Sequence, residues 1–110
     1  MDENNKLVLV YTTYPSASAA QSVAELLVKD RLAACVNVLP AMIAAYEWDG
    51  QLQKDDEAVC IVKTRAGLSE QVMAVIKDHH PYDTPALLVL PVMASGEDYT
   101  AWVLQQTNSR

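Results

Sequence analysis

The sequence predicts an α+β protein with the ferredoxin-like element order β-α-β-β-α-β, an antiparallel sheet and one further helix at the C-terminus. Short runs rich in β-branched residues alternate with segments whose apolar residues recur at helical spacing. The pair Asp49 and Gly50 separates two long strand-like runs and indicates a tight hairpin. The length of 110 residues is typical of one domain. We therefore expect residues 1–110 to form a single domain, with a frayed or disordered segment at 1–6.

The first strand is expected at residues 7–13, because this run is apolar and rich in β-branched side chains. The helix that follows is expected to begin at a capping serine, Ser16 or Ser18, and to end near Asp30. Its apolar residues recur at intervals of three and four positions and form one stripe: Ala20, Val23, Ala24, Leu27 and Val28.

Residues 34–48 and 51–65 are expected to form the two arms of the hairpin. If Asp49 and Gly50 form the turn, continuing the register places Val38 opposite Ile61. Pro40 has no N–H to donate to the ladder, so we expect a bulge or a sheet edge there.

The inner part of this hairpin is apolar on both faces. One predicted face carries Val36, Val38, Val59 and Ile61, and the other carries Leu39, Ala41, Ala58, Cys60 and Val62. One layer of helices covers only one face of a sheet. Another copy of the chain is the simplest cover for the second face, so we expect a homo-oligomer.

The second half of the chain repeats the pattern of helix and strand. A helix is expected after Gly67, and it ends near Pro81 because the residue before a proline is pushed away from helical angles. A fourth strand is expected at 86–92. Ser95 as N-cap and Asp98 in the third helical position resemble a capping box, which predicts the last helix.

Composition excludes several function classes. The formal net charge of −6 argues against a nucleic-acid partner, because an acidic protein repels the phosphate backbone. No stretch approaches the roughly 20 apolar residues that span a bilayer, and residues 1–6 do not resemble a signal peptide. We expect no membrane partner and a cytoplasmic location. The absence of nucleotide-binding and hydrolase motifs predicts a protein without enzymatic activity.

The adjacent histidines His79 and His80 are open to three interpretations. They lie where the second helix ends before Pro81, and a histidine at a helix C-terminus is favoured by the helix dipole. Imidazole also binds copper, nickel and zinc, although adjacent residues of a helix point in different directions. A catalytic histidine is the third alternative.

The hairpin carries further candidate residues. Lys63 stands in an apolar part of its strand and either reaches solvent or pairs with a carboxylate. Glu57 is on the same predicted face but about 20 Å away along an extended strand, so we expect the two to pair only across subunits. Tyr46 and Trp48 share a face near the hairpin tip and form either a subunit contact or a surface for ligand stacking.

Two cysteines complete the candidate residues. Cys35 and Cys60 lie in apolar runs without C-x-x-C spacing, which excludes a zinc module or a redox motif of that kind. We expect both to be buried core thiols, because free cysteine is among the residues most often buried.

Six stretches of the chain occur in an order and spacing that are specific in combination. They are 31–37 (RLAACVN), 46–50 (YEWDG), 62–64 (VKT), 79–85 (HHPYDTP), 88–92 (LVLPV) and 99–102 (YTAW). Together they resemble the CutA family, the divalent-cation tolerance proteins, over nearly the whole chain from about Leu7 onward. The resemblance implies ferredoxin-like subunits assembled into tight homotrimers, with long hairpins that reach across neighbouring subunits.

The resemblance also implies a link to tolerance of copper and other divalent cations. In a bacterial member, copper binding is attributed to a cysteine late in the first strand and to two adjacent histidines. Here His79 and His80 match the histidines, and Tyr11 occupies the position of the cysteine. The expected function is therefore that of a trimer associated with divalent metal tolerance. Copper(II) or another divalent cation is the candidate ligand of His79 and His80, and no cofactor is obligatory.

The trimer of the family also resembles the PII signalling proteins in shape. The alternative function is therefore a trimeric signalling or small-molecule-binding module without a physiological metal. Its small-molecule or protein partner would bind at the clefts between subunits. The residues assigned to these clefts are Cys35, Tyr46, Trp48, Glu57 and Lys63.

Overall fold

The computed structural model of the chain describes residues 3–108 and contains a four-stranded antiparallel sheet with the strand order β2-β3-β1-β4. The strands are β1 (Leu7–Tyr14), β2 (Cys35–Trp48), β3 (Gln51–Arg65) and β4 (Leu88–Pro91), and the helices are α1 (Ala17–Lys29), α2 (Ser69–Asp78) and α3 (Glu97–Gln106), with short 3-10 turns η1 (Glu3–Asn5) and η2 (Ala66–Leu68). The predicted fold class is confirmed. None of the helices within 3–108 has the length and hydropathy of a membrane span.

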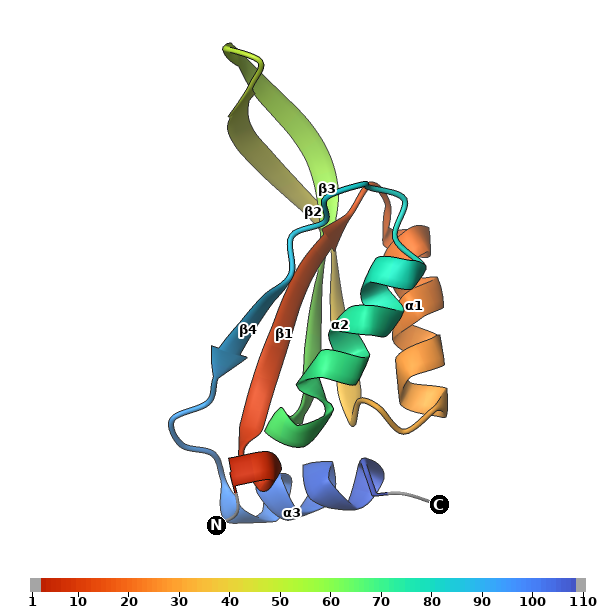
Figure 1. The fold of residues 1–110 in the computed structure, drawn as a ribbon, viewed down its shortest axis with the longest axis vertical. Helices are drawn as coiled ribbons and strands as arrows, with labels where there is room; N and C mark the ends of the chain where they lie inside the picture. The colour runs from red at the N-terminus through yellow and green to blue at the C-terminus, as the bar shows by residue number, and fades with distance from the viewer. Residues whose placement is uncertain (1–2, 109–110) are drawn as a thin grey trace.

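Helices α1 and α2 lie on one face of the sheet, and the hairpin of β2 and β3 extends well beyond it (Figure 1). Alternate residues of β1 point towards α1 and α2, so that Val8, Val10, Thr12 and Tyr14 are buried. The main core cluster consists of Val10, Tyr14, Ala20, Val23, Leu27, Ala33, Ala58, Cys60, Val62, Val72 and Ile76. Helix α3 crosses the opposite end of the sheet from the hairpin tip (Figure 1).

The first two helices begin and end close to where the sequence predicts. The Ser16 hydroxyl accepts the N–H of Ala19 at 3.2 Å and caps α1, as expected. Helix α2 ends at Asp78, with His79 as its C-cap residue. The fourth strand covers only Leu88–Pro91 of the run expected at 86–92.

The predicted capping box of α3 is wrong. The N-cap residue is Gly96, and no side chain caps the helix. The hydroxyl of Ser95 bonds instead to the hydroxyl of Thr100, so it does not reach the free N–H groups of the first turn. The acidic residues of that turn, Glu97 and Asp98, still suit the positive end of the helix dipole.

The predicted bulge near Pro40 is confirmed. Trp48 pairs with Gln51 at the tip, as expected, and this register continues as far as Met42. Between Leu39 and Met42 the register shifts, because two residues of β2 oppose one residue of β3. The proline supplies no N–H for the ladder at this point.

The bulge overturns the predicted pairing of the inner hairpin. Val38 faces Cys60 and not Ile61, and Val36 faces Val62. A shift of one residue moves side chains to the other face of a strand. Val36 and Val38 therefore pack against the helix-covered core, and the predicted assignment of both to the face of Ile61 is wrong.

The face of the sheet away from α1 and α2 is also apolar. Cross-strand neighbours share a face, and the register aligns Tyr11 with Ile61 and Leu88, and Leu9 with Leu90. Leu88 is 56% exposed and Leu90 is 43% exposed. We call this surface, formed by Leu9, Tyr11, Leu39, Ile61, Leu88 and Leu90, the open face.

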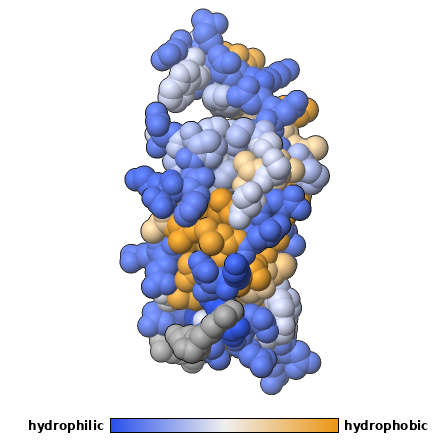
Figure 2. All heavy atoms as spheres, turned by 90° about the vertical axis from the view of Figure 1, so that its right-hand side faces the viewer, coloured by the Kyte–Doolittle hydropathy of each residue, from blue (hydrophilic) through white to orange (hydrophobic). Residues whose placement is uncertain are grey.

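A second apolar region lies on the α1 side of the molecule. Figure 2 views the molecule from that side and shows apolar side chains gathered at mid-height, with polar side chains above and below. A shallow hollow between α1 and the edge strand β2 is lined by Ala24, Val28, Val36 and Val38 together with polar residues of α1. The molecule thus presents apolar surface along its β2 edge as well as on the open face.

The N-terminal segment is described from Glu3 onward, and the expectation of a frayed or disordered segment at 1–6 stays a prediction. Glu3–Asn5 form η1, and the carbonyl of Lys6 accepts the N–H of Ala66 at 2.7 Å. The amide oxygen of Asn5 accepts a hydrogen bond from the Arg65 guanidinium at 2.9 Å. Residues 1 and 2 lie outside the described residues.

The buried position of Ile76 allows a direct test of the core. Ile76→Ala is expected to lower the free energy of unfolding by about 2–5 kcal/mol, because it removes fully buried side-chain atoms and leaves a cavity. The neighbouring exposed residue provides the control, since Lys77→Ala is expected to change the free energy by less than about 0.5 kcal/mol. Urea unfolding followed by circular dichroism measures both, and equal effects would show that α2 does not pack as described.

Candidate functional site

The His80 imidazole joins the end of β1 to the loop after α2. Its Nε2 lies 2.6 Å from the carbonyl oxygen of Thr13, and its Nδ1 lies 3.1 Å from the backbone nitrogen of Tyr82. A carbonyl only accepts and a backbone N–H only donates. The proton of the neutral ring is therefore assigned to Nε2, and Nδ1 is the acceptor. Both ring nitrogens are engaged within the chain.

The ring of His80 also lies between two tyrosines. It stacks on Tyr14, with ring centroids 4.3 Å apart and planes 20° apart, and it makes a tilted contact with Tyr82 at 4.9 Å. Tyr14 is fully buried, and this burial raises the pKa of its phenol. His80 is thus fixed by packing as well as by its two hydrogen bonds.

Tyr82 continues the contacts of His80 to the base of the hairpin. Its hydroxyl donates to Oε2 of Glu57 at 2.9 Å. Burial and this hydrogen bond raise the pKa of Tyr82 to about 12. On the hairpin itself, the Tyr46 hydroxyl donates to Asp55, and this bond raises the pKa of Tyr46. One pair of phenol and carboxylate thus lies at the base of the hairpin, and a second lies on its outer part.

His79 points away from this arrangement. Its Nδ1 lies 3.0 Å from the carbonyl of Val75 one turn earlier in α2, so Nδ1 is assigned as the donor. Nε2 is then the acceptor atom, and it has no partner among the described residues. The side chain is 49% exposed and lines a shallow hollow with Ser22, Leu26 and Pro81.

The two histidines of one chain do not fit the chelate that the sequence suggests. Copper and zinc bind imidazole through a nitrogen that carries no proton. His79 offers such a nitrogen, whereas His80 would have to give up its bond to Tyr82. Within residues 3–108, no group of three or more His, Cys, Asp or Glu side chains is placed to hold a metal ion.

Tyr11, at the position of the expected cysteine ligand, serves another contact. Its hydroxyl, on the open face, lies 3.8 Å from the sulfur of Met42. His80 contacts β1 at the backbone of Thr13 and the ring of Tyr14. Tyr11 thus supplies no third ligand beside the histidines.

The residues assigned to a cleft fall into two separate groups within one chain. Cys35 pairs with Lys63 across the strands, and the Lys63 ammonium lies 5.7 Å from the ring centroid of Tyr99 in α3. Glu57 lies at the base of the outer hairpin, Tyr46 lies between this base and the tip, and Trp48 is 67% exposed at the tip. The expectation for the cysteines holds for Cys60, which is buried, whereas Cys35 is half-buried.

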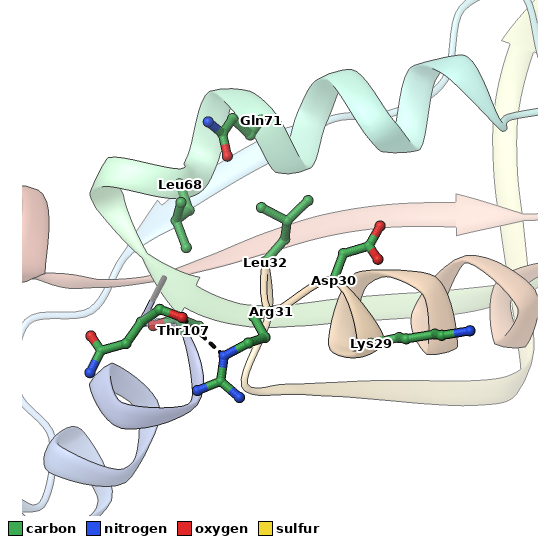
Figure 3. A pocket seen from close by; sticks show the side chains of 8 residues that line it. Lys29, Asp30, Arg31, Leu32, Leu68, Gln71 and Thr107 are labelled. Carbon is green, nitrogen blue, oxygen red and sulfur yellow. Dashed lines mark hydrogen bonds between the residues drawn. The ribbon is translucent and has the colours of Figure 1, made fainter. Parts of the chain in front are cut away.

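A third location combines residues that sequence reasoning did not single out. A hollow of about 480 Å³ lies where the ends of α1 and α3 meet the start of α2 (Figure 3). Arg31 lines it in the left-handed conformation, with φ of 60°, and donates to the carbonyls of Gln105 and Asn108 at 2.8 and 2.9 Å. Its guanidinium thus adds hydrogen bonds to carbonyls at the end of α3 and suits the negative end of that helix.

Sequence reasoning also missed Tyr82 as a partner of Glu57. The spacing of two residues between His80 and Tyr82 is a signal for a side chain that bonds to the backbone of its own loop. No local pattern indicates the contacts with Thr13 and Tyr14, since they are far from His80 in the sequence.

Comparison with known proteins shows the family of the chain. Residues 8–106 match the model of a family described as CutA1 divalent ion tolerance protein. The chain belongs to the CutA1 family. The resemblance seen in the sequence is confirmed, and divalent ion tolerance is the property for which this family is named.

Three relatives illustrate the similarity. The divalent-cation tolerance protein CutA of Pyrococcus horikoshii is 41% identical over 101 residues, which cover 92% of this chain and 98% of that protein. The chloroplastic protein CutA of Arabidopsis thaliana is 36% identical over 112 residues, but the chain spans only 62% of its length. The crystal structure of CutA1 from Oryza sativa superposes with a TM-score of 0.92 at 31% identity, covering 99% of this chain and all (100%) of that one.

The raised pKa values predict how stability depends on pH. Burial raises the pKa of Cys60 from 9.0 to about 11, and that of Tyr82 rises from 10.0 to about 12. A group whose pKa is higher in the folded state contributes stability below its unfolded pKa and loses it as pH rises towards the folded value. We expect the melting temperature to fall as pH rises from about 9 to 12.

Two variants separate the contributions of Cys60 and Tyr82 to the pH dependence of stability. Cys60→Ala is expected to remove most of the fall between about pH 9 and 10, and Tyr82→Phe to reduce the slope above about pH 10, where Tyr14 still contributes. Thermal unfolding in reducing buffer at a series of pH values provides the measurement. If neither variant changes the slope of melting temperature against pH, the assignment of this pH dependence to Cys60 and Tyr82 is wrong.

Proposed function

We propose that this CutA-family protein supports tolerance to divalent cations as a homotrimer of non-catalytic subunits. In this proposal it acts through the surfaces between its chains and not through a chelate of His79 and His80. The observation that carries the proposal is the open face of the sheet, which is apolar, partly exposed and not covered by α1 or α2, although it lies directly behind the core.

The open face has the properties of a contact surface. Its leucines at positions 39, 88 and 90 are each more than two-fifths exposed. Contiguous apolar patches of this kind mark interaction sites in soluble proteins. The edge strands β2 and β4 also have one side without a strand partner in the described chain, and such edges favour pairing with another chain.

The hairpin supplies a complementary projection. Ile43, Trp48 and Leu52 are 73%, 67% and 73% exposed along the part of the hairpin that extends past the sheet. A hairpin that contacts a different surface of the next chain makes a head-to-tail contact, and such contacts form a ring when the rotation from one chain to the next closes. Three subunits is the number that the family resemblance implies.

The intersubunit surfaces are the proposed location of any small-molecule or protein partner. An assembly can bring the group of Cys35 and Lys63 close to the group of Tyr46 and Glu57 of another chain, which one chain keeps apart. This is the PII-like alternative that the sequence suggests. A cytoplasmic location belongs to the same proposal and is supported by the two free thiols, because disulfides prevail in oxidising compartments.

Direct binding of copper(II) or another divalent cation is the second candidate function. The observation in its favour is the acceptor nitrogen Nε2 of His79, whose ring is oriented by a bond from Nδ1 to a carbonyl, as is usual for metal-binding histidines. A single imidazole is a weak site unless another chain adds ligands. We therefore rank this candidate below the assembly.

Charge placed on the open face tests the proposal. Leu90→Asp is expected to convert the trimer to monomers, because a buried unpaired carboxylate strongly opposes association. Ala74→Asp, on the exposed side of α2, is the control and is expected to leave the trimer intact. Light scattering after size exclusion gives the mass, and circular dichroism verifies that both variants are folded. A monomeric wild-type protein, or a Leu90→Asp variant that remains trimeric, would contradict the proposal.

A further inference from the structure

The outer part of the hairpin has little support from the rest of the chain. Strand β1 ends at Tyr14, which pairs with Ala58, so β3 has no second strand partner from Glu57 to its start. Over this stretch β2 and β3 pair only with each other. An isolated two-stranded ribbon is marginally stable in water. Its direction relative to the sheet must therefore be fixed by contacts at its base.

The contacts of Glu57 meet this requirement. Glu57 is the first residue of β3 beyond the part that pairs with β1, and its carboxylate accepts the hydroxyl of Tyr82 at 2.9 Å. Tyr82 belongs to the loop between α2 and β4, which Figure 1 shows passing over the end of β1 near the base of the hairpin. A hydrogen bond to a charged group is stronger than one between neutral groups.

His80 in turn fixes Tyr82. Its Nδ1 accepts the N–H of Tyr82 at 3.1 Å, and the two rings are in contact. The opposite ring nitrogen donates to Thr13 at the end of β1, and the ring stacks on buried Tyr14. A continuous series of contacts thus runs from the core to the hairpin.

We propose that His80 is a positioning residue that couples the core of the subunit to the β2–β3 hairpin through Tyr82 and Glu57. The coupling needs one ring nitrogen that donates and one that accepts, so it uses the neutral imidazole with its proton on Nε2. Binding of a metal at Nδ1 would displace the N–H of Tyr82. In this chain the coupling therefore excludes His80 as a metal ligand.

The inference rests on the proposed function in one respect, since the hairpin matters for assembly only if it contacts another chain. The coupling itself is a property of each subunit. It is measured by the exchange of backbone amide hydrogens, which reports opening of local structure. Residues 42–57 report on the outer hairpin, and residues 59–63 report on the part of β3 inside the sheet.

Two substitutions interrupt the contacts at different points. His80→Gln can place an amide N–H near the position of Nε2, towards Thr13, but it has no acceptor at the position of Nδ1 for the N–H of Tyr82. Tyr82→Phe removes only the phenol oxygen that bonds to Glu57. We expect each to accelerate exchange in residues 42–57 about tenfold, a size of effect within the range for the loss of one hydrogen bond. Exchange in residues 59–63 is expected to stay within about twofold of the wild type.

The double variant provides the decisive comparison. Because both changes interrupt the same series of contacts, His80→Gln combined with Tyr82→Phe is expected to exchange no faster than the faster single variant. Tyr99→Phe, which removes a phenol oxygen in α3 near Lys63 and away from the outer part of the hairpin, is the matched control and is expected to leave exchange in residues 42–57 unchanged.

Unchanged exchange in residues 42–57 of either single variant would overturn the proposal. Exchange accelerated about a hundredfold in the double variant would also overturn it, because the effects of two independent contacts multiply. Light scattering on the same samples separates the two proposals. A monomeric wild type would contradict the trimer but not the coupling, whereas a trimer with unchanged exchange would contradict the coupling alone.

Discussion

Burial of the sheet on one face only is the constraint on which the rest of this structure depends. Helices α1 and α2 cover one side, and the core between them and the sheet contains Val10, Leu27 and Ile76. Within residues 3–108 no third helix lies along the other side, because α3 crosses the end of the sheet. The apolar open face and the long hairpin are therefore left for contacts with other chains, which is where we place the function.

The same constraint explains why His80, one of two adjacent histidines, has a structural role. A hairpin that leaves the sheet has no helix beneath it, and its base is held from the loop between α2 and β4 instead. His80 provides this support because a flat ring with one donor and one acceptor can bond in two opposite directions while it stacks. In a family named for divalent ions, this histidine is committed to structure, and only His79 presents a nitrogen that can accept a cation.

Much of the fold follows from local patterns in the sequence. Asp49 and Gly50 locate the turn, and Pro40 locates the bulge, because both depend on backbone properties of the residues themselves. The pairing beyond the bulge could not be predicted, since the position of one extra residue decides which face Val36 and Val38 occupy. The role of His80 was likewise inaccessible, because Thr13 and Tyr14 approach it only after the whole subunit has folded.

The protonation of the His80 ring tests the central claim most directly. The chain contains two histidines, so long-range proton–nitrogen correlation spectra of the imidazoles are simple, and a His79→Gln variant assigns them. We expect His80 to show a proton on Nε2 and none on Nδ1, and to keep this pattern when zinc is added, while any response to zinc is confined to His79. If both rings change together as one equivalent of zinc is added, the two histidines bind metal as a pair, and our assignment of His80 to structure is wrong.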